Sequence, residues 1–332
     1  MKSVGIIATP ASGKDIRRLI SQSRLVPNQE KINIVKRILG GLEAGGIDKV
    51  LFMPDYSNLA KSAANEYHGL IQTEILNVPI FNKDIDTINS VKEMIQRDVS
   101  VIIALGGDGT SRAVSIASES VPILPVSTGT NNVFPFMVEG TLAGISTAYI
   151  VQHPESLSIC APVQKKFDIE TDSGIRDISL VDIAVSKEYF VGSRAIWDIN
   201  SVSELFLAIA EPHTIGLSSI GGWANPIDRN ESRGLHIRFS EKPTGYSVSA
   251  PMVPGILSEV YIESINVIEK NQMNEVSLSP STIALDGERT IPIREGEKVQ
   301  VTLNKNGPTV LNPFIAIREA AKNNFLNNWN KL

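Results

Sequence analysis

The sequence predicts two domains of different class, an α/β domain followed by a β-rich domain. The chain has 332 residues, which is more than one hydrophobic core usually organises. Strand-like and helix-like patterns alternate over residues 1–150, and this favours a parallel sheet flanked by helices. Over residues 151–309, short alternating segments are broken by Gly, Pro and Asn, which is typical of antiparallel strands. We expect residues 310–332 to return to the first domain.

In the first half, buried apolar runs predict strands, and apolar residues at helical spacing predict helices. Gly45 and Gly46 follow the first predicted helix and end it. Asp86 or Thr87 can cap the third helix. The expected strands are 4–9, 49–53, 74–78 and 99–105, and the expected helices are 31–46, 59–70 and one that begins near residue 86.

In the second half, the apolar residues alternate with polar ones, as they do in strands with one buried face. The tail from Pro313 to Trp329 carries apolar residues at helical spacing, so we expect a last helix there that packs on the first domain. The expected strands are 163–171, 178–185, 234–239, 246–250, 260–268 and 298–303.

Composition excludes several classes of function. Lys and Arg number 31 against 36 Asp and Glu, for a net charge of −5, and no basic stretch favours nucleic acid or an anionic membrane as a partner. Cys160 is the only cysteine, which excludes an internal disulfide or a thiolate zinc cluster and fits a cytoplasmic location. We expect no signal peptide and no membrane span, because no apolar run of about 18 residues occurs.

The run Gly106-Gly107-Asp108-Gly109-Thr110 follows a predicted strand and precedes a stretch compatible with a helix. By itself such a run could be a tight turn. Glycines also let backbone N–H groups approach a phosphate chain, and Asp108 would stand beside a metal ion or a reacting hydroxyl. The loops 9–14 and 127–132 are also rich in small and polar residues, and ligands gather where parallel strands end. Together these features predict phosphoryl transfer. Arg112 stands where a dinucleotide fingerprint needs its last glycine, so that motif is rejected.

Three motifs in this order resemble the superfamily of NAD kinases and diacylglycerol-type lipid kinases. They are GGDGT at 106–110, Pro-x-x-x-Gly-Thr-x-Asn at 125–132 and a late Asp-Gly-Glu at 286–288. The segments 10–18, 127–135 and 190–198 are most similar to the acetoin-catabolism protein X type of ATP-NAD kinase. The resemblance implies an NAD kinase-like two-domain fold, an active site between the domains, ATP and Mg²⁺ as cofactors, and a homo-oligomer.

The resemblance also implies roles for individual residues. In NAD kinases the aspartate of the glycine motif, here Asp108, takes the proton of a ribose 2′-hydroxyl. Lipid kinases instead place the base or a metal-linked carboxylate in the late motif, here Asp286 and Glu288, so both assignments stay open and Asp286 is also a candidate metal ligand. The expected nucleotide contacts are Ser12, Gly13, Lys14, Gly106, Gly107, Gly109, Thr110, Thr128, Gly129, Thr130, Asn131 and Asn132.

The acceptor is less well defined. Most NAD kinases carry an Asn-Glu pair where this sequence has Val181 and Asp182, and valine cannot form the side-chain hydrogen bond. Arg194, Trp197 and Asp198 could hold a phosphate, an adenine and a hydroxyl, or form a surface ion pair beside a core tryptophan. The resemblance to NAD kinases still makes NAD the first-choice acceptor. The alternatives are a kinase for a lipid or another small alcohol, and a catalytically silent nucleotide-binding regulator. Polyphosphate in place of ATP also stays open.

Overall fold

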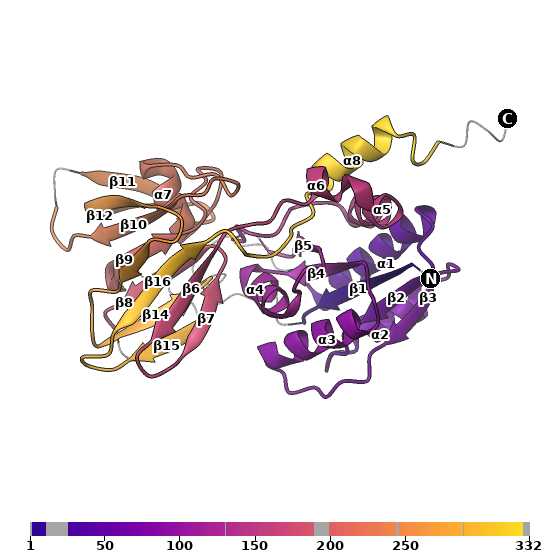
Figure 1. The fold of residues 1–332 in the computed structure, drawn as a ribbon, viewed down its shortest axis with the longest axis horizontal. Helices are drawn as coiled ribbons and strands as arrows, with labels where there is room; N and C mark the ends of the chain where they lie inside the picture. The colour runs from indigo at the N-terminus through magenta and orange to yellow at the C-terminus, as the bar shows by residue number, and fades with distance from the viewer. Residues whose placement is uncertain are drawn as a thin grey trace.

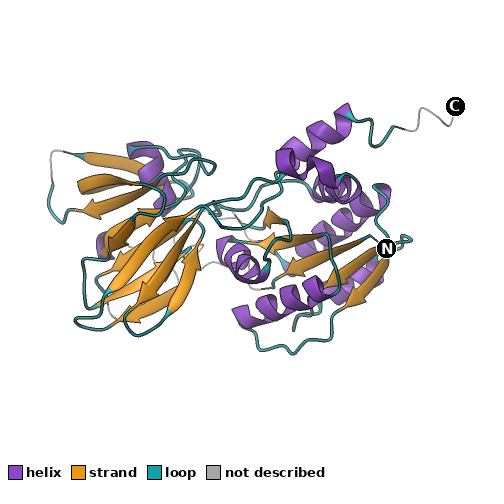
Figure 2. Ribbon diagram, viewed as in Figure 1, coloured by secondary structure: helices purple, strands orange, loops and turns teal. Residues whose placement is uncertain are grey.

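The computed structural model describes residues 2–10, 26–129, 131–188, 199–243, 246–287 and 289–327. Figure 1 shows an α/β domain beside a β-rich domain, with helix α8 lying against the α/β domain. Figure 2 shows that helices flank the sheet of the first domain, whereas strands make up most of the second. The fold class predicted from the sequence is confirmed.

Within the described residues, the first domain holds a parallel sheet of five strands in the order β3-β2-β1-β4-β5. Apolar side chains cover both faces of β1, because Val4 and Ile6 join one core and Ile7 joins the other. Helices α1, α2 and α5 pack on the first face, and α3 and α4 on the second. The strands are β1 (Ser3–Ala8), β2 (Lys49–Phe52), β3 (Gln72–Ile75), β4 (Val101–Gly106) and β5 (Ile123–Ser127). The helices are α1 (Asn28–Ala44), α2 (Leu59–Glu66), α3 (Asp84–Gln96), α4 (Asp108–Ala117) and α5 (Gly140–Gln152).

Glycines allow α1 and α5 to pack closely. A Cβ atom on Gly144 would lie 2.3 Å from the carbonyl oxygen of Ile38, and one on Gly41 would lie 2.2 Å from that of Thr141. Side chains at these positions would therefore push the two helices apart. This contact supports the chain that runs from the end of β5 into α5.

The second domain is a sandwich of two sheets. Its described strands form one sheet in the order β11-β12-β10-β9-β8-β14-β15 and another in the order β13-β16-β6-β7. Phe167 and Ile169 of β6 pack between the sheets against Phe206 and Ile283, and the short helix α7 (Leu217–Ala224) packs on the other face of the larger sheet. The strands are β6 (Lys166–Thr171), β7 (Arg176–Ser179), β8 (Asp182–Ser186), β9 (Val202–Leu207), β10 (Gly234–Phe239), β11 (Ser247–Val253), β12 (Ile256–Ile268), β13 (Met273–Glu275), β14 (Ser281–Leu285), β15 (Arg289–Ile293) and β16 (Val299–Asn304).

The chain returns to the first domain after β16. Val310 forms an isolated bridge with Ile123 of β5. The side chain of Asn312 then caps helix α8 (Pro313–Lys322), and Ala316 and Ala320 enter the core beside α1 and α5. The predicted C-terminal helix is confirmed, although it ends at Lys322. It packs against α5 and against the short helix α6 (Leu157–Cys160). None of the helices in the described ranges has the length and apolar character needed to cross a membrane.

One predicted strand is wrong. The apolar run 178–185 is interrupted, because β7 ends at Ser179 and β8 begins at Asp182. The backbone N–H groups of Leu180 and Val181 donate to the carboxylate of Asp286. A distant side chain thus satisfies these donors, which the sequence pattern alone could not indicate.

Candidate functional site

The glycine motif lies where β4 passes into α4. β4 ends at Gly106, Gly107 precedes the helix in an extended conformation, and Asp108 is the first helical residue. A Cβ atom on Gly106 would lie 2.4 Å from Oγ1 of Thr110, and one on Gly107 would lie 2.9 Å from Oδ1 of Asn132. The first turn of a helix presents unsatisfied N–H groups and a partial positive charge, so this turn can receive an anion such as a phosphate.

The carboxylate of Asp108 is held by backbone amides of the loop after β5. Its Oδ1 atom accepts from the N–H groups of Phe134 at 2.8 Å and Val133 at 3.1 Å, and its Oδ2 atom accepts from Val133 at 3.1 Å. Amide donors stabilise the ionised form of a carboxylate. Asp108 is half-buried, so the protein fixes this charge at the start of α4 without enclosing it.

The loop after β5 also contacts the glycine motif directly. The N–H group of Thr128 donates to the carbonyl of Gly106 at 3.2 Å, and the side-chain amide of Asn132 donates to the hydroxyl of Ser127 at 2.9 Å. Among the described residues, no hydrogen-bond partner meets the buried Oγ1 atom of Thr128 or the buried Oδ1 atom of Asn131. Because buried polar atoms normally have partners, these two oxygens are candidates for contact with a ligand.

The end of β1 completes this group of loops. Oγ1 of Thr9 lies 3.2 Å from Oγ1 of Thr110. The ammonium group of Lys31, which is fully buried on α1, donates to the carbonyls of Thr9 at 3.0 Å and Pro10 at 2.9 Å. The ends of β1, β4 and β5 therefore meet, as expected for neighbouring parallel strands. Lys31 was not predicted as a site residue, because it occupies an otherwise ordinary helical position.

Asp286 is placed differently from Asp108. It lies in the turn between β14 and β15 with φ of 49°, and its side chain is completely buried. Its carboxylate accepts from the hydroxyl of Ser179 at 2.8 Å and from the N–H groups of Leu180 at 3.1 Å and Val181 at 2.8 Å. Burial raises the pKa of Asp286, whereas nearby Arg112 and these donors act to lower it. These contacts favour a structural role for Asp286 over the roles of base and metal ligand that the resemblance implies.

Arg112 joins the two domains beside Asp286. It is 1% exposed, and its guanidinium contacts Asp177 of β7 at 2.7 Å, Asp84 of α3 at 3.1 Å and Asp286 at 3.9 Å. Since Arg112 lies one helical turn after Asp108, the same helix carries the half-buried carboxylate and the buried cation. From the sequence, Arg112 was identified only as a departure from a dinucleotide motif. Its position one helical turn after Asp108 could have indicated that it lies near the site.

The remaining predicted site residues divide into two groups. Asp182 is buried at the start of β8, and its carbonyl accepts from the N–H group of Asp286 at 3.0 Å, so it lies beside the late motif. In the part of the chain that the structure describes, no three His, Cys, Asp or Glu side chains gather as a metal site. Eight predicted residues lie outside the described residues, namely Ser12, Gly13, Lys14, Thr130, Arg194, Trp197, Asp198 and Glu288.

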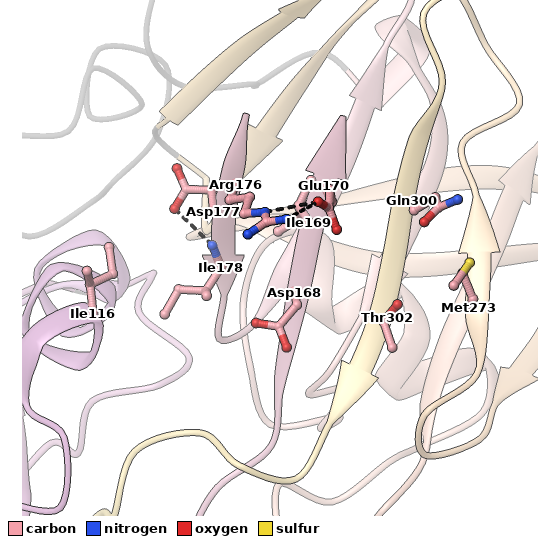
Figure 3. A pocket seen from close by; sticks show the side chains of 10 residues that line it. All are labelled: Ile116, Asp168, Ile169, Glu170, Arg176, Asp177, Ile178, Met273, Gln300 and Thr302. Carbon is pink, nitrogen blue, oxygen red and sulfur yellow. Dashed lines mark hydrogen bonds and ion pairs between the residues drawn. The ribbon is translucent and has the colours of Figure 1, made fainter. Parts of the chain in front are cut away.

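A pocket of about 380 Å³ lies at the other end of α4. Figure 3 shows Ile116 of α4 facing Ile178 of β7, with Arg176 bonded to Glu170 on the same sheet. Ile116 comes more than two turns after Asp108, roughly 12 Å along the helix axis. This pocket is therefore separate from the glycine loop, and its charged side chains bond to one another and to neighbouring residues.

Comparisons with known proteins identify the family to which the chain belongs. Residues 4–152 match the family model of the ATP-NAD kinase N-terminal domain, and residues 165–306 match that of the acetoin catabolism protein X C-terminal domain. The chain is 33% identical over 335 residues to acetoin catabolism protein X of Cupriavidus necator, covering 97% of this chain and 93% of that protein. A solved structure from Bacillus anthracis str. Sterne, described provisionally as a diacylglycerol kinase, superposes with a TM-score of 0.46 at 12% identity, covering 95% of this chain and 98% of the other. The chain therefore belongs to the acetoin catabolism protein X family, with an N-terminal domain of the ATP-NAD kinase family.

Proposed function

We propose that this protein is an ATP- and Mg²⁺-dependent kinase that phosphorylates a hydroxyl of a small molecule, with NAD as the first-choice acceptor. The observation that carries the proposal is the position of Asp108, fixed by the amides of Val133 and Phe134 at the start of a helix that follows a glycine loop. This arrangement puts anion-binding N–H groups beside a carboxylate, as transfer of a phosphate to a hydroxyl requires.

The donor side fits a triphosphate. Gly106 and Gly107 let Thr110 and Asn132 lie close to the first turn of α4. The buried oxygens of Thr128 and Asn131 point to a ligand that supplies hydrogen-bond donors or a cation. Oxygen atoms of this kind are the ligands that Mg²⁺ prefers. A bound Mg²⁺ ion would neutralise charge on the phosphates.

On the acceptor side, Asp108 would accept the hydrogen bond of the attacking hydroxyl and align its oxygen with the terminal phosphorus. The transition state of phosphoryl transfer is loose, so alignment and charge stabilisation supply most of the catalysis. The proton of the hydroxyl would move to the Asp108 carboxylate as its oxygen bonds to the γ-phosphorus, while the bond from that phosphorus to the β–γ bridging oxygen breaks and ADP leaves. The half-buried state of Asp108 supports this role, whereas Asp286 has no exposed side-chain surface.

A kinase for a different alcohol is the second candidate. The side chain of Val181 is fully buried in a core, and its N–H group bonds to Asp286. This position therefore offers no side-chain hydrogen bond to a ribose, unlike the asparagine of most NAD kinases. A small alcohol or a lipid headgroup would not need that contact.

A transfer assay with labelled ATP tests the proposal. The purified protein would be given Mg²⁺ with NAD, NADH, diacylglycerol or a panel of small alcohols, and polyphosphate would replace ATP in a parallel series. We expect phosphate transfer to NAD. Transfer only to another alcohol would support the second candidate. Tight ATP binding without transfer or hydrolysis would contradict both and support a regulatory protein. Glu170→Gln, in the separate pocket, is the control variant and should retain wild-type transfer.

A further inference from the structure

Arg229 forms a second contact between the domains, in addition to that of Arg112. Arg229 belongs to the second domain, in the chain between α7 and β10. Its guanidinium donates from Nη2 to the carbonyl of Val133 at 3.0 Å and from Nη1 to the carbonyl of Phe134 at 3.2 Å. Arg229 thus binds the two residues whose N–H groups hold Asp108.

The Val133 carbonyl and the Phe134 N–H group belong to one peptide group. Arg229 contacts its oxygen at 3.0 Å, and Asp108 accepts from its N–H group at 2.8 Å. Because a peptide group is planar and stiff, a cation fixed at the oxygen also fixes the direction of the N–H bond. A cation at the carbonyl polarises the group and strengthens the N–H group as a donor.

Arg229 is itself held rigidly. Glu211 accepts from Nε of Arg229 at 3.4 Å, from Nη2 at 3.2 Å and from the Arg229 backbone N–H group at 3.2 Å. The side chain of Glu211 is only 7% exposed, and the ring of Phe136 lies 5.2 Å from the guanidinium carbon. A planar guanidinium with a carboxylate on one edge and an aromatic ring against it has little freedom to turn.

We propose that Glu211 and Arg229 are positioning residues that set the Asp108 carboxylate from the second domain, through the Val133–Phe134 peptide group. This proposal rests on the proposed function, because it gives Asp108 a part in phosphate transfer. Neither residue is placed against a reacting atom. Their effect depends on the domain contact, so a shift of the second domain that moved Arg229 would also move the carboxylate.

Hydrogen exchange tests whether Arg229 holds the Val133–Phe134 peptide group, and this measurement does not require activity. Mass spectrometry would follow amide exchange in peptides that cover Val133 and Phe134, in the wild type and in Arg229→Met. We expect these amides to exchange at least about tenfold faster in the variant, because their bonds to Asp108 lose one support. Arg233→Met is the matched control, since Arg233 lies on the same loop and pairs with exposed Glu231. Unchanged exchange in Arg229→Met, with the fold intact, would overturn the proposal.

A double-mutant cycle then tests whether Arg229 acts through Asp108. We expect Arg229→Met to lower kcat about 10- to 100-fold, with the KM for ATP changed less than about threefold. In an Asp108→Asn background the same change should lower kcat less than about threefold further. Equal losses in both backgrounds would overturn the proposal, because they would show a general structural effect.

Milder variants keep the test decisive if Arg229→Met does not fold. Arg229→Lys keeps the charge but cannot reach two carbonyls and a carboxylate at once, so we expect an intermediate loss in both assays. We expect Glu211→Gln to cause a similar intermediate loss in both assays. Wild-type values for both variants would overturn the proposal. If the wild type transfers phosphate to no acceptor, the proposed function fails, while the exchange experiment still decides whether Arg229 holds the Asp108 amides.

Discussion

Asp108 and Asp286 both stand next to a glycine in a short polar motif, yet the fold treats them differently. Two backbone amides hold Asp108 and leave it half-buried at the start of a helix. Asp286 is completely enclosed, in a left-handed turn, and bonded to the chain between β7 and β8. A carboxylate that must meet a substrate needs fixed orientation and an open side. One that joins two turns needs burial and several donors.

The different surroundings of Asp108 and Asp286 separate a catalytic function from a structural one, whereas the sequence left both residues as candidates for the base. Both carboxylates were candidates for the base, because each lies in a motif that the superfamily uses for chemistry. In the structure, Arg112 links them, since it lies on the helix that Asp108 begins and contacts Asp286 at 3.9 Å. We infer that the late motif holds the second domain against α4, and that the glycine motif carries the reaction.

Asp108→Asn should produce the largest effect on activity. Asparagine keeps an oxygen that can accept from Val133 and Phe134, so the fold should survive, but it cannot take a proton. We expect kcat to fall by about two to four orders of magnitude, the usual range for a general base, while ATP binding is retained. Steady-state kinetics and calorimetric titration with ATP would measure these two quantities. Wild-type turnover in this variant would contradict the role of Asp108.

Asp286→Ala should act on stability instead. The change removes the acceptor for Ser179, Leu180 and Val181 and leaves the buried Arg112 with one fewer carboxylate. Each buried donor left without an acceptor costs about 1–3 kcal/mol, so we expect a total loss of about 3–5 kcal/mol in urea unfolding. Asp286→Asn keeps one acceptor oxygen and should lose less. If Asp286→Asn folded with wild-type stability and lost turnover, Asp286 would be the catalytic carboxylate and the comparison would reverse.

Arg112→Lys should give a smaller loss of stability. An ammonium group can approach one carboxylate closely, whereas the guanidinium contacts Asp177 and Asp84 through separate nitrogens. We expect a loss of about 1–3 kcal/mol, because the buried cation then keeps fewer of the hydrogen bonds that the guanidinium makes. Urea unfolding would measure this loss. Arg176→Lys is the control, because Arg176 of β7 forms an exposed ion pair with Glu170 of β6. An effect no larger than that of the control would show that Arg112 does not stabilise the domain contact.

Much of the fold followed from local patterns in the sequence. Four strands of the parallel sheet are short apolar runs, and the glycine motif lies where a strand meets a helix, so local patterns indicated both. β3 was predicted at 74–78 and lies at Gln72–Ile75, because this edge strand is mostly polar and partly exposed. The break between β7 and β8 was missed, because Leu180 and Val181 continue an apolar run and only the distant Asp286 shows why they leave the sheet. β9 and β14 were also missed. Both are buried on both faces, so their residues lack the alternation of apolar and polar side chains that was used to find strands.

The loops of the candidate site could be predicted from the sequence, but the contacts that join these loops to the second domain could not. The loops after β1, β4 and β5 were identified, because parallel strands end at the same edge. The residues that join the domains were not, since Arg112, Arg229 and Lys31 are single cations at ordinary spacings. Each becomes significant only through partners far away in the sequence. Pairing across domains depends on tertiary packing, which no local pattern reports.

The smallest expected effect concerns Lys165. This residue tests whether burial shifts the pKa of a charged group, as we infer for Asp286. Its ammonium group donates to the carbonyls of Asp228 and Arg233 at 2.8 Å each, and so holds the loop that carries Arg229. Burial lowers the pKa of Lys165 to about 8. Between that value and the ordinary lysine pKa of about 10.4, the unfolded chain binds more protons than the folded chain, so this group makes the protein more stable as pH rises.

We expect the wild type to gain about 1 kcal/mol from this group between pH 8 and pH 9, and Lys165→Met to lack that gain. Urea unfolding at several pH values from 6 to 10 would measure the difference between the two proteins. Lys322→Met, at an exposed position on α8, corrects for the loss of one ammonium group. Below about pH 7 the difference between wild type and Lys165→Met should stay constant, because the lysine is then protonated in both folded and unfolded chains. A difference that also stayed constant above pH 8 would mean that solvent reaches this ammonium group. Burial would then be too weak a cause for the shift at Asp286 as well.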